Sequence, residues 1–291
     1  MKDFSFTPKP PDRSLYMPLI DRALEEDIGH GDVTTSLVIP YQLKAEASIV
    51  AREEAVVAGT FVSRDVFLRL DDTLEFSDLA GEGTKISKDG TIMRIRGRAS
   101  SILQGERVAL NFLQRLCAIA TLTRKFVEKV SGLSCRIIDT RKTTPCMRIL
   151  QKYAMRAGGG SNHRFGLYDG ILIKDNHIAA CGSIKEALKR AGRMSHHNLR
   201  PEIEVSDLSE LMEAMESGAE AVLLDNFTPL ALKEAVKIAR ETRPGMILEA
   251  SGGITLNNVR EYAETGVDLI SVGALTHSAG SVDLSLEFSE A

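Results

Sequence analysis

Residues 202–225, EIEVSDLSELMEAMESGAEAVLLD, contain one complete strand–helix–strand repeat. Two short apolar runs, EIEV and AVLLD, flank the amphipathic segment LSELMEAMESG, whose final residue, Gly218, is typical of a helix C-cap. Short apolar strands joined by a helix predict parallel strands in a sheet that helices cover. The stretch therefore predicts an α/β architecture for this part of the chain.

The same rhythm recurs throughout the second half of the chain, with amphipathic helical segments between most of the apolar runs. The runs are RIID, GILIK, EIEV, AVLLD, MILEA and DLISVG. They predict about six parallel strands, with a seventh left open. No GxGxxG motif follows the first strand, so we favour a closed or nearly closed barrel over an open dinucleotide-binding sheet. The pattern alone leaves the open sheet as the alternative.

The first third of the chain has a different pattern. Residues 44–59 alternate apolar and polar side chains, and residues 80–97 carry Gly and Asp-Gly turn signals between short strands. Together with a helical segment at residues 14–27, they predict a small α+β unit with an antiparallel sheet. Ser101 and Gln104 fit a capping box before a long helical run at residues 106–130, which we expect to join two domains.

Composition excludes several classes of protein. The 291 residues carry a formal net charge of −4 and 43% hydrophobic residues, which is ordinary for a globular protein and argues against broad capture of nucleic acid. No apolar run approaches the roughly 20 residues of a membrane helix. The N-terminus lacks a signal-peptide pattern, and the four scattered cysteines fit a reduced, cytoplasmic chain without a structural metal.

Charged and small residues follow the predicted strands of the second half, at the end where barrels collect their chemistry. Glycines there let backbone N–H groups approach a phosphate, and the carboxylates of Glu204 and Asp225 suit ribose hydroxyls or a hydrated Mg²⁺. Cationic side chains suit a substrate with several negative charges: Arg141, Lys142, His163, Arg164 and Lys174. The coincidence predicts a phosphate-containing anion at a barrel rim.

Each feature has a purely structural explanation when it is taken alone. A solvated helix face is favoured over ligand binding for three cations spaced four apart, Arg148, Lys152 and Arg156. SGG is a common turn, and a lone histidine such as His163 is more often structural than catalytic. Asp225 can cap the following helix, and Cys117 fits core packing. Only the shared position at successive strand ends favours the ligand interpretation.

Longer motifs make the pattern specific. In chain order they are EEDIGHGDVTT, GERVALNFLQRLCAIATLT, DTRKTTP, AGGGSNHRFGLYDGILIKDNH, EIEV, VLLDNF, EASGGIT and ISVGALTHSA. The series resembles the quinolinate phosphoribosyltransferase family, also called nicotinate-nucleotide pyrophosphorylase (carboxylating), from about Leu15 to Ala279. The run RKTTP…GGG…NHR…KDNH is highly specific.

The resemblance implies a fold and a reaction. The family joins an N-terminal α+β open sandwich domain, expected at residues 1–117, to a C-terminal incomplete TIM-like α/β barrel, expected at 118–276; the tail 277–291 is expected to pack on the first domain. The family makes nicotinate mononucleotide, carbon dioxide and pyrophosphate from quinolinate and phosphoribosyl pyrophosphate with Mg²⁺, in NAD biosynthesis. A homodimer with shared active sites is implied, and hexamers are left open.

The resemblance also assigns roles to residues. The expected quinolinate contacts are Thr140, Arg141, Lys142, His163, Arg164, Lys174 and Arg107 of the partner subunit. Glu204 and Asp225 match the acidic pair that faces the ribose and the metal, directly or through water. The phosphate-binding loops match Ser251, Gly252, Gly253 and Gly273, and Ser271 is a further expected substrate-binding residue. Of these, the expected catalytic residues are Lys142, Lys174, Glu204 and Asp225.

One residue departs from the family pattern. Cys146 stands where the family usually has Gly after the Pro of RKTTP. If the position requires a positive φ, cysteine strains it by roughly 1–2 kcal/mol. The departure therefore concerns the conformation of this loop, and a reactive-thiol role for Cys146 is disfavoured.

Three rival functions remain at this point. A paralogous phosphoribosyltransferase-like protein associated with molybdenum transport shares the fold but only part of the motif series. A non-catalytic anion-binding barrel needs no carboxylate pair like Glu204 and Asp225. A barrel decarboxylase without ribosyl transfer needs no phosphate loop beside a dicarboxylate pocket.

Overall fold

The chain divides into two compact units, which a computed structural model describes over residues 8–195 and 199–289. The first unit comprises the described residues of Met1–Arg124, Thr143–Gly159 and Leu275–Ala291. The second comprises the described residues of Lys125–Lys142 and Gly160–Ala274. The predicted domain boundary between residues 117 and 118 lies inside helix α4 (Ala99–Lys129) and stays a prediction.

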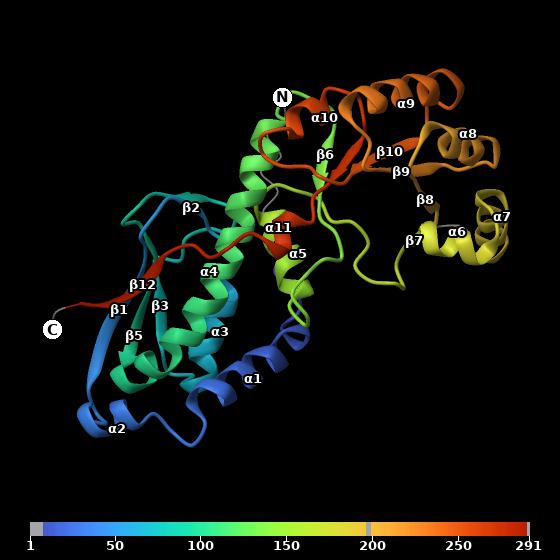
Figure 1. Cartoon of the computed structure of the whole chain (residues 1–291). Coiled ribbons are helices and arrows are strands. Elements are labelled where there is room, and N and C mark those ends of the chain that lie inside the picture. The colour runs from blue at the N-terminus through green and yellow to red at the C-terminus, as the bar shows by residue number, and fades with distance from the viewer. Residues whose placement is uncertain (1–7, 196–198, 290–291) are drawn as a thin grey trace. The chain divides into compact units, whose positions relative to one another are not determined.

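The first unit is an α+β domain built on a four-stranded antiparallel sheet (Figure 1). The strand order is β12 (Leu284–Phe288), β1 (Lys44–Ala51), β5 (Thr91–Arg98) and β3 (Glu75–Ser77). A separate pair joins β2 (Ala55–Val56) to β4 (Lys85–Ile86). The helices before α4 are η1 (Arg13–Leu15), α1 (Met17–Ile28), α2 (Val33–Val38) and α3 (Thr60–Leu70). The predicted N-terminal α+β domain is confirmed.

The core of this unit depends on close helix packing. At Gly105 of α4, an added Cβ would lie 2.6 Å from Phe67 of α3, so only glycine permits this approach. Phe61 of α3 stacks edge-on between Tyr16 and Tyr153, with ring centroids 5.4 and 4.9 Å apart. Tyr153 lies on α5 (Arg148–Ala157), which the aromatic contacts anchor to the first unit.

Two local predictions for these helices are wrong, because tertiary contacts override them. Helix α4 begins at Ala99, so Ser101 lies inside the helix and its hydroxyl donates to Asp71 at 2.9 Å instead of capping the terminus. Lys152 of α5 is only 2% exposed, so the predicted solvated face does not hold for this residue. Cys117, by contrast, is fully buried, which confirms core packing.

The loop before α5 contains the strained position that the sequence raised. The backbone N–H of Met147 donates to the carbonyl of Thr144 at 3.1 Å, which closes a turn with Pro145 and Cys146 at its centre. Cys146 has a φ of 64°. Proline followed by a residue with positive φ is the signature of a type II turn, whose third position favours glycine. Cysteine therefore occupies a position that suits glycine better.

Replacing Cys146 with glycine should stabilise the protein. Removing the strain of the left-handed conformation stabilises the folded state by roughly 1–2 kcal/mol. The greater conformational freedom of glycine in the unfolded chain offsets about half of this gain. We expect a net gain of about 0.5–1 kcal/mol in the free energy of unfolding, measured by urea denaturation. Cys146→Ala is the matched control, because it removes the thiol and keeps the strain. An equal gain for both variants would assign the effect to the thiol instead.

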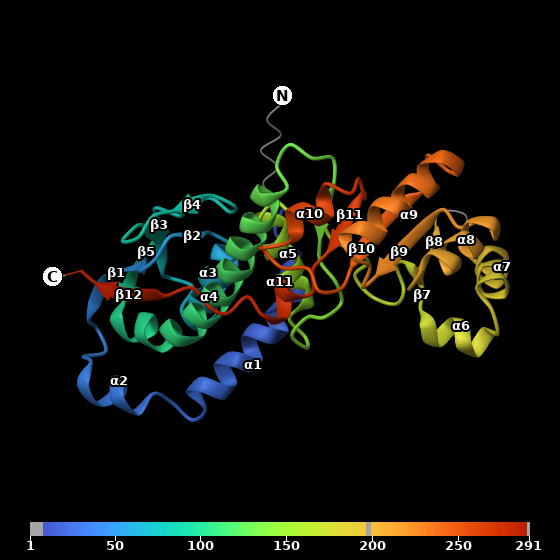
Figure 2. The same ribbon diagram turned by 45° about the horizontal axis from the view of Figure 1, so that its top comes forward.

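The second unit contains a six-stranded parallel sheet in the order β6–β11–β10–β9–β8–β7. The strands are β6 (Arg136–Ile138), β7 (Ile171–Ile173), β8 (Pro201–Val205), β9 (Ala221–Asp225), β10 (Ile247–Ser251) and β11 (Leu269–Ser271). The connecting helices are α6 (Asp175–Cys181), α7 (Ile184–Met194), α8 (Leu208–Glu216), α9 (Pro229–Thr242) and α10 (Val259–Ala263), with α11 (Ala274–His277) after β11. Figure 2 shows α7 to α10 along one side of the strands.

The strand order is that of an incomplete barrel. Strands β7 to β11 lie side by side in chain order, and the last strand, β11, pairs with the first, β6. Within the described residues β6 and β7 do not pair with each other; instead Ser161 bridges to Ile138 of β6. All six predicted apolar runs form these strands, and Gly218 follows α8 with a φ of 89°. The predicted incomplete α/β barrel is confirmed.

Within the described residues, no helix combines the length and apolar character needed to cross a membrane.

Candidate active site

The predicted rim residues lie at the carboxyl ends of the parallel strands. Asp225 and Ser251 end β9 and β10 and are register partners. Lys174 directly follows β7, and Arg141 and Lys142 follow β6 by a few residues. Parallel register brings these positions to one end of the sheet, although three-residue strands such as β7 position them only through short turns.

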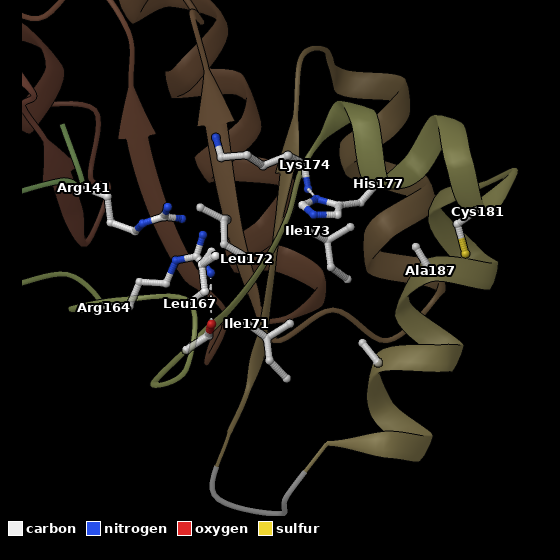
Figure 3. Close-up of a pocket in the computed structure, with 12 residues that line it drawn as sticks. Arg141, Arg164, Leu167, Ile171, Leu172, Ile173, Lys174, His177, Cys181 and Ala187 are labelled. Carbon is white, nitrogen blue, oxygen red and sulfur yellow. Dashed lines mark hydrogen bonds between the residues drawn. The ribbon is translucent and has the colours of Figure 1, made fainter.

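Three cations of the predicted set line one cavity of about 410 Å³ (Figure 3). They are Arg141, Arg164 and Lys174, and the apolar part of the wall includes Leu172 and Ile173. Burial, followed by the positive charge of Arg141, lowers the pKa of Arg164. Two guanidinium groups that repel each other beside a lysine favour an anion as the occupant. The volume lies within the range of small-molecule sites.

Lys174 and Glu204 form an ion pair. The side chain of Lys174 is 44% exposed and that of Glu204 is 15% exposed, so the pair lies at the edge of the cavity. The backbone N–H of Lys174 donates to His177 Nδ1 at 2.9 Å, and this bond fixes the start of α6. Glu202 and Glu204 share the face of β8 opposite buried Ile203. One residue expected to bind quinolinate thus contacts one expected to face the ribose.

His163 points toward the interior carboxylates of the barrel. Its Nε2 lies 3.2 Å from Glu202 and 3.6 Å from Glu249, and its Nδ1 accepts the backbone N–H of Arg164 at 2.6 Å. His163 does not line the 410 Å³ cavity but a neighbouring one of about 290 Å³. His163 and Arg141 thus line different cavities, which share Arg164, and the expectation that both contact quinolinate stays a prediction.

The glycine loop after β10 lies against the end of β9. Gly252 and Gly253 have φ values of 95° and 64°. An added Cβ at Gly252 would lie 2.1 Å from Asn226 Oδ1, whereas one at Gly253 would meet no atom within 4 Å. Gly252 thus permits close packing of the two loops, and the exposed backbone at Gly253 is open to a phosphate.

The remaining predicted residues are not among those that line the 410 Å³ cavity. Ser271 is buried, and its hydroxyl lies 3.5 Å from the carbonyl of Ala250. Thr140 accepts the backbone N–H of Lys142 at 3.0 Å, and the Lys142 side chain is exposed. Gly273 is half-buried after β11. Arg107 is exposed on α4 of the first unit.

Sequence reasoning missed Glu249 altogether and left Glu202 without a role. Glu249 is 1% exposed in the middle of β10. Its signal was present as the single acid within the apolar run MILEA, because a charge in a buried strand needs a partner.

Two family models match nearly the whole chain. The N-terminal domain of quinolinate phosphoribosyl transferase matches residues 32–117, and the C-terminal domain matches residues 119–287. The chain belongs to the quinolinate phosphoribosyltransferase family. A Bacillus subtilis relative named as a probable nicotinate-nucleotide pyrophosphorylase (carboxylating) is 44% identical over 92% of both chains, and a Mycobacterium leprae nicotinate-nucleotide pyrophosphorylase (carboxylating) is 40% identical over 92% of this chain and 95% of its own.

Solved structures of the quinolinate phosphoribosyltransferase family have the same fold. The nicotinate-nucleotide pyrophosphorylase from Francisella tularensis superimposes with a TM-score of 0.90 at 38% identity, covering 97% of this chain and 99% of its own. The enzyme of the same name from Ehrlichia chaffeensis gives a TM-score of 0.89 at 38% identity, covering 94% and 98%. These comparisons establish both the fold and the family independently of the site geometry.

Proposed function

We propose that this chain is a decarboxylating phosphoribosyltransferase that converts quinolinate and phosphoribosyl pyrophosphate into nicotinate mononucleotide, carbon dioxide and pyrophosphate. The observation that carries the proposal is a cavity lined by three cations, two of which follow strands of the sheet that carries a carboxylate pair and an open glycine loop at its carboxyl ends. Arg141, Arg164 and Lys174 suit the two carboxylates of quinolinate. The loop at Gly253 suits the 5′-phosphate of the sugar.

The chemistry follows from the signs of these charges. The ring nitrogen of quinolinate attacks the anomeric carbon as pyrophosphate leaves, so positive charge develops on the sugar. The carboxylates of Glu204 and Asp225 stabilise that charge, and the cations orient the nucleophile. The alkylated, cationic nitrogen then accepts the electron pair released when the adjacent carboxylate departs as carbon dioxide. A proton from solvent then takes the place of the lost carboxylate on the ring carbon. The reaction needs no protein nucleophile.

The Lys174–Glu204 ion pair couples the binding of the two substrates. When a quinolinate carboxylate binds Lys174, it competes with Glu204 for the ammonium group. The released Glu204 carboxylate is then available to the ribose at the moment when its charge is needed. Each substrate thus binds more tightly when the other is present. In the free enzyme, the ion pair compensates the charges of both side chains.

We also propose that Mg²⁺ takes part. The donor set suits this ion, because Mg²⁺ prefers oxygen ligands, keeps several waters and commonly binds one or two carboxylates together with substrate phosphates. Glu204 and Asp225 would hold it, directly or through water, and both are partly exposed. When bound, the ion would offset the negative charge of the departing pyrophosphate.

The expected cytoplasmic location also stays a proposal.

The test is turnover of quinolinate with phosphoribosyl pyrophosphate, followed as nicotinate mononucleotide and pyrophosphate. Nicotinic acid is the competing substrate, because it lacks the carboxylate that is lost. We expect turnover of quinolinate and little or none of nicotinic acid. Turnover of nicotinic acid alone would defeat the assignment, and binding of both substrates without turnover would favour a non-catalytic anion-binding barrel.

We further propose a homodimer in which Arg107 of the partner subunit completes each site. Arg107→Ala and Lys174→Met should each inactivate a homodimer. When equal amounts exchange subunits, half of the dimers are mixed and each contains one intact site, so we expect about a quarter of the native activity. Re-equilibration of two lots of the same variant is the control. No recovery on mixing, with exchange verified by mass, would show that the site is not shared.

A further inference from the structure

Inside the barrel, two carboxylates and one imidazole form a cluster that the proposed reaction does not use directly. Glu249 of β10 is 1% exposed, and no described residue hydrogen-bonds to either of its carboxylate oxygens. Nε2 of His163 lies 3.6 Å from Glu249 and 3.2 Å from Glu202 of β8. The ligating atoms of all three side chains fall within 4.8 Å of one another.

The histidine contributes a single proton to this cluster. The backbone N–H of Arg164 must donate, so His163 Nδ1, which accepts it at 2.6 Å, carries no hydrogen. The remaining hydrogen lies on Nε2, and its nearer acceptor is Glu202. One imidazole N–H cannot satisfy two buried carboxylates, and an ionised carboxylate without donors costs several kcal/mol.

A second proton on one of the carboxylates resolves the conflict, and burial decides which one. The side chain of Glu249 is 1% exposed and that of Glu202 is 13% exposed, so ionisation is less favourable at Glu249. Burial, followed by the negative charge of Glu202, raises the pKa of Glu249, and the nearby Ser271 hydroxyl acts in the opposite direction but more weakly. A neutral Glu249 can donate to Glu202, which then accepts from both of its neighbours.

The segment held by this cluster leads to the proposed substrate cavity. Arg164 lines the cavity, and its guanidinium group also donates to the carbonyl of Gly170 at 3.0 Å. On the other side, buried Asp139 accepts the backbone N–H of His163 at 2.8 Å and the side-chain amide of Asn162 at 2.6 Å. Residues 162–164 are thus tied to the end of β6 and to β8, directly after Ser161, which bridges to Ile138 of β6.

We propose that Glu249, as a neutral acid, is a positioning residue for the anion cavity: it donates to Glu202, Glu202 holds the His163 ring, and that ring fixes the backbone from which Arg164 reaches the substrate. The inference rests on the proposed function for its kinetic readout only. It assigns Glu249 and Glu202 no contact with substrate. It also assigns His163 a positioning role behind the cavity wall.

The deciding experiment compares two replacements of Glu249. Glu249→Gln keeps a donor of the same shape, so we expect a quinolinate KM within about threefold of wild type. Glu249→Leu keeps the volume and removes the donor, so we expect the quinolinate KM to rise about tenfold while the KM for phosphoribosyl pyrophosphate stays unchanged. Glu202→Leu removes both acceptor oxygens and should resemble Glu249→Leu. An equal loss in Glu249→Gln and Glu249→Leu would overturn the proposal.

Two readouts work without turnover and separate this inference from the proposed function. Imidazole ¹⁵N shifts of the free protein, with the His163 signal assigned from His163→Gln, should show one protonated nitrogen at His163 in wild type and in Glu249→Gln. A doubly protonated ring would overturn the neutral-acid assignment. So would stoichiometric zinc or manganese that is present in wild type and absent from Glu249→Gln, because the cluster would then be a metal site. If Glu249→Leu does not fold, the Gln variant and the ¹⁵N shifts decide alone.

Discussion

Lys174→Met will lower kcat/KM for quinolinate by about two to three orders of magnitude. Lys174 lines the cavity, and methionine retains most of the side-chain length without the charge. Removing one partner of a partly buried charge pair costs about 2–5 kcal/mol, and each 1.4 kcal/mol corresponds to a factor of ten. Steady-state kinetics with each substrate varied in turn, together with equilibrium binding of quinolinate, measures the loss.

The pattern of the loss in Lys174→Met matters as much as its size. Quinolinate affinity should fall far more than affinity for phosphoribosyl pyrophosphate, because the proposed site assigns the lysine to the pyridine carboxylates. Lys237→Met is the matched control, since Lys237 is exposed on α9, and it should change neither constant by more than about twofold. Equal losses of affinity for both substrates would place Lys174 near the phosphates as well. They would contradict its assignment to the quinolinate part of the site.

Most of the fold could be predicted from the sequence because the parallel strands are buried by helices. Strand β9 is buried at four of its five positions, and such strands leave continuous apolar runs that need no alignment to detect. The carboxyl-end positions of Asp225 and Ser251 followed from the same reasoning, since parallel strands share one direction. Closure of the barrel through β6 and β11 depends on pairing between strands that are distant in the sequence. The alternation of strands and helices along the chain does not show which strands pair.

The features that escaped prediction depend on where side chains point. Ser101 had the spacing of a cap, but its hydroxyl found Asp71 thirty residues earlier in the chain. The direction of the His163 ring depends on Glu202 and Glu249, which come from two later strands. No spacing rule reports that three segments meet inside a barrel. A buried acid within an apolar strand is the signal that deserves a search for partners in such sequences.

Asp225→Asn should lower kcat about 100-fold or more while quinolinate affinity stays near wild type. The amide keeps the shape of the side chain and removes the charge that opposes the cationic sugar, and a single preorganised electrostatic contact contributes about 10²–10³ in kcat. Because that charge develops only in the transition state, the loss should appear in kcat more than in KM. Rapid-quench measurement of a single turnover isolates the chemical step from product release.

The neighbourhood of Asp225 supports a loss of charge without a loss of structure. Its carboxylate accepts the side-chain amide of Asn226 at 2.6 Å, and the carbonyl of an amide replacement can accept the same bond. Glu204→Gln should act on the same developing charge, so the double variant should lose less than the product of the two single losses. Glu234→Gln on α9 serves as the control, because Glu234 is exposed and is not among the predicted site residues. Unchanged kcat in Asp225→Asn would mean that the sugar cation is stabilised elsewhere.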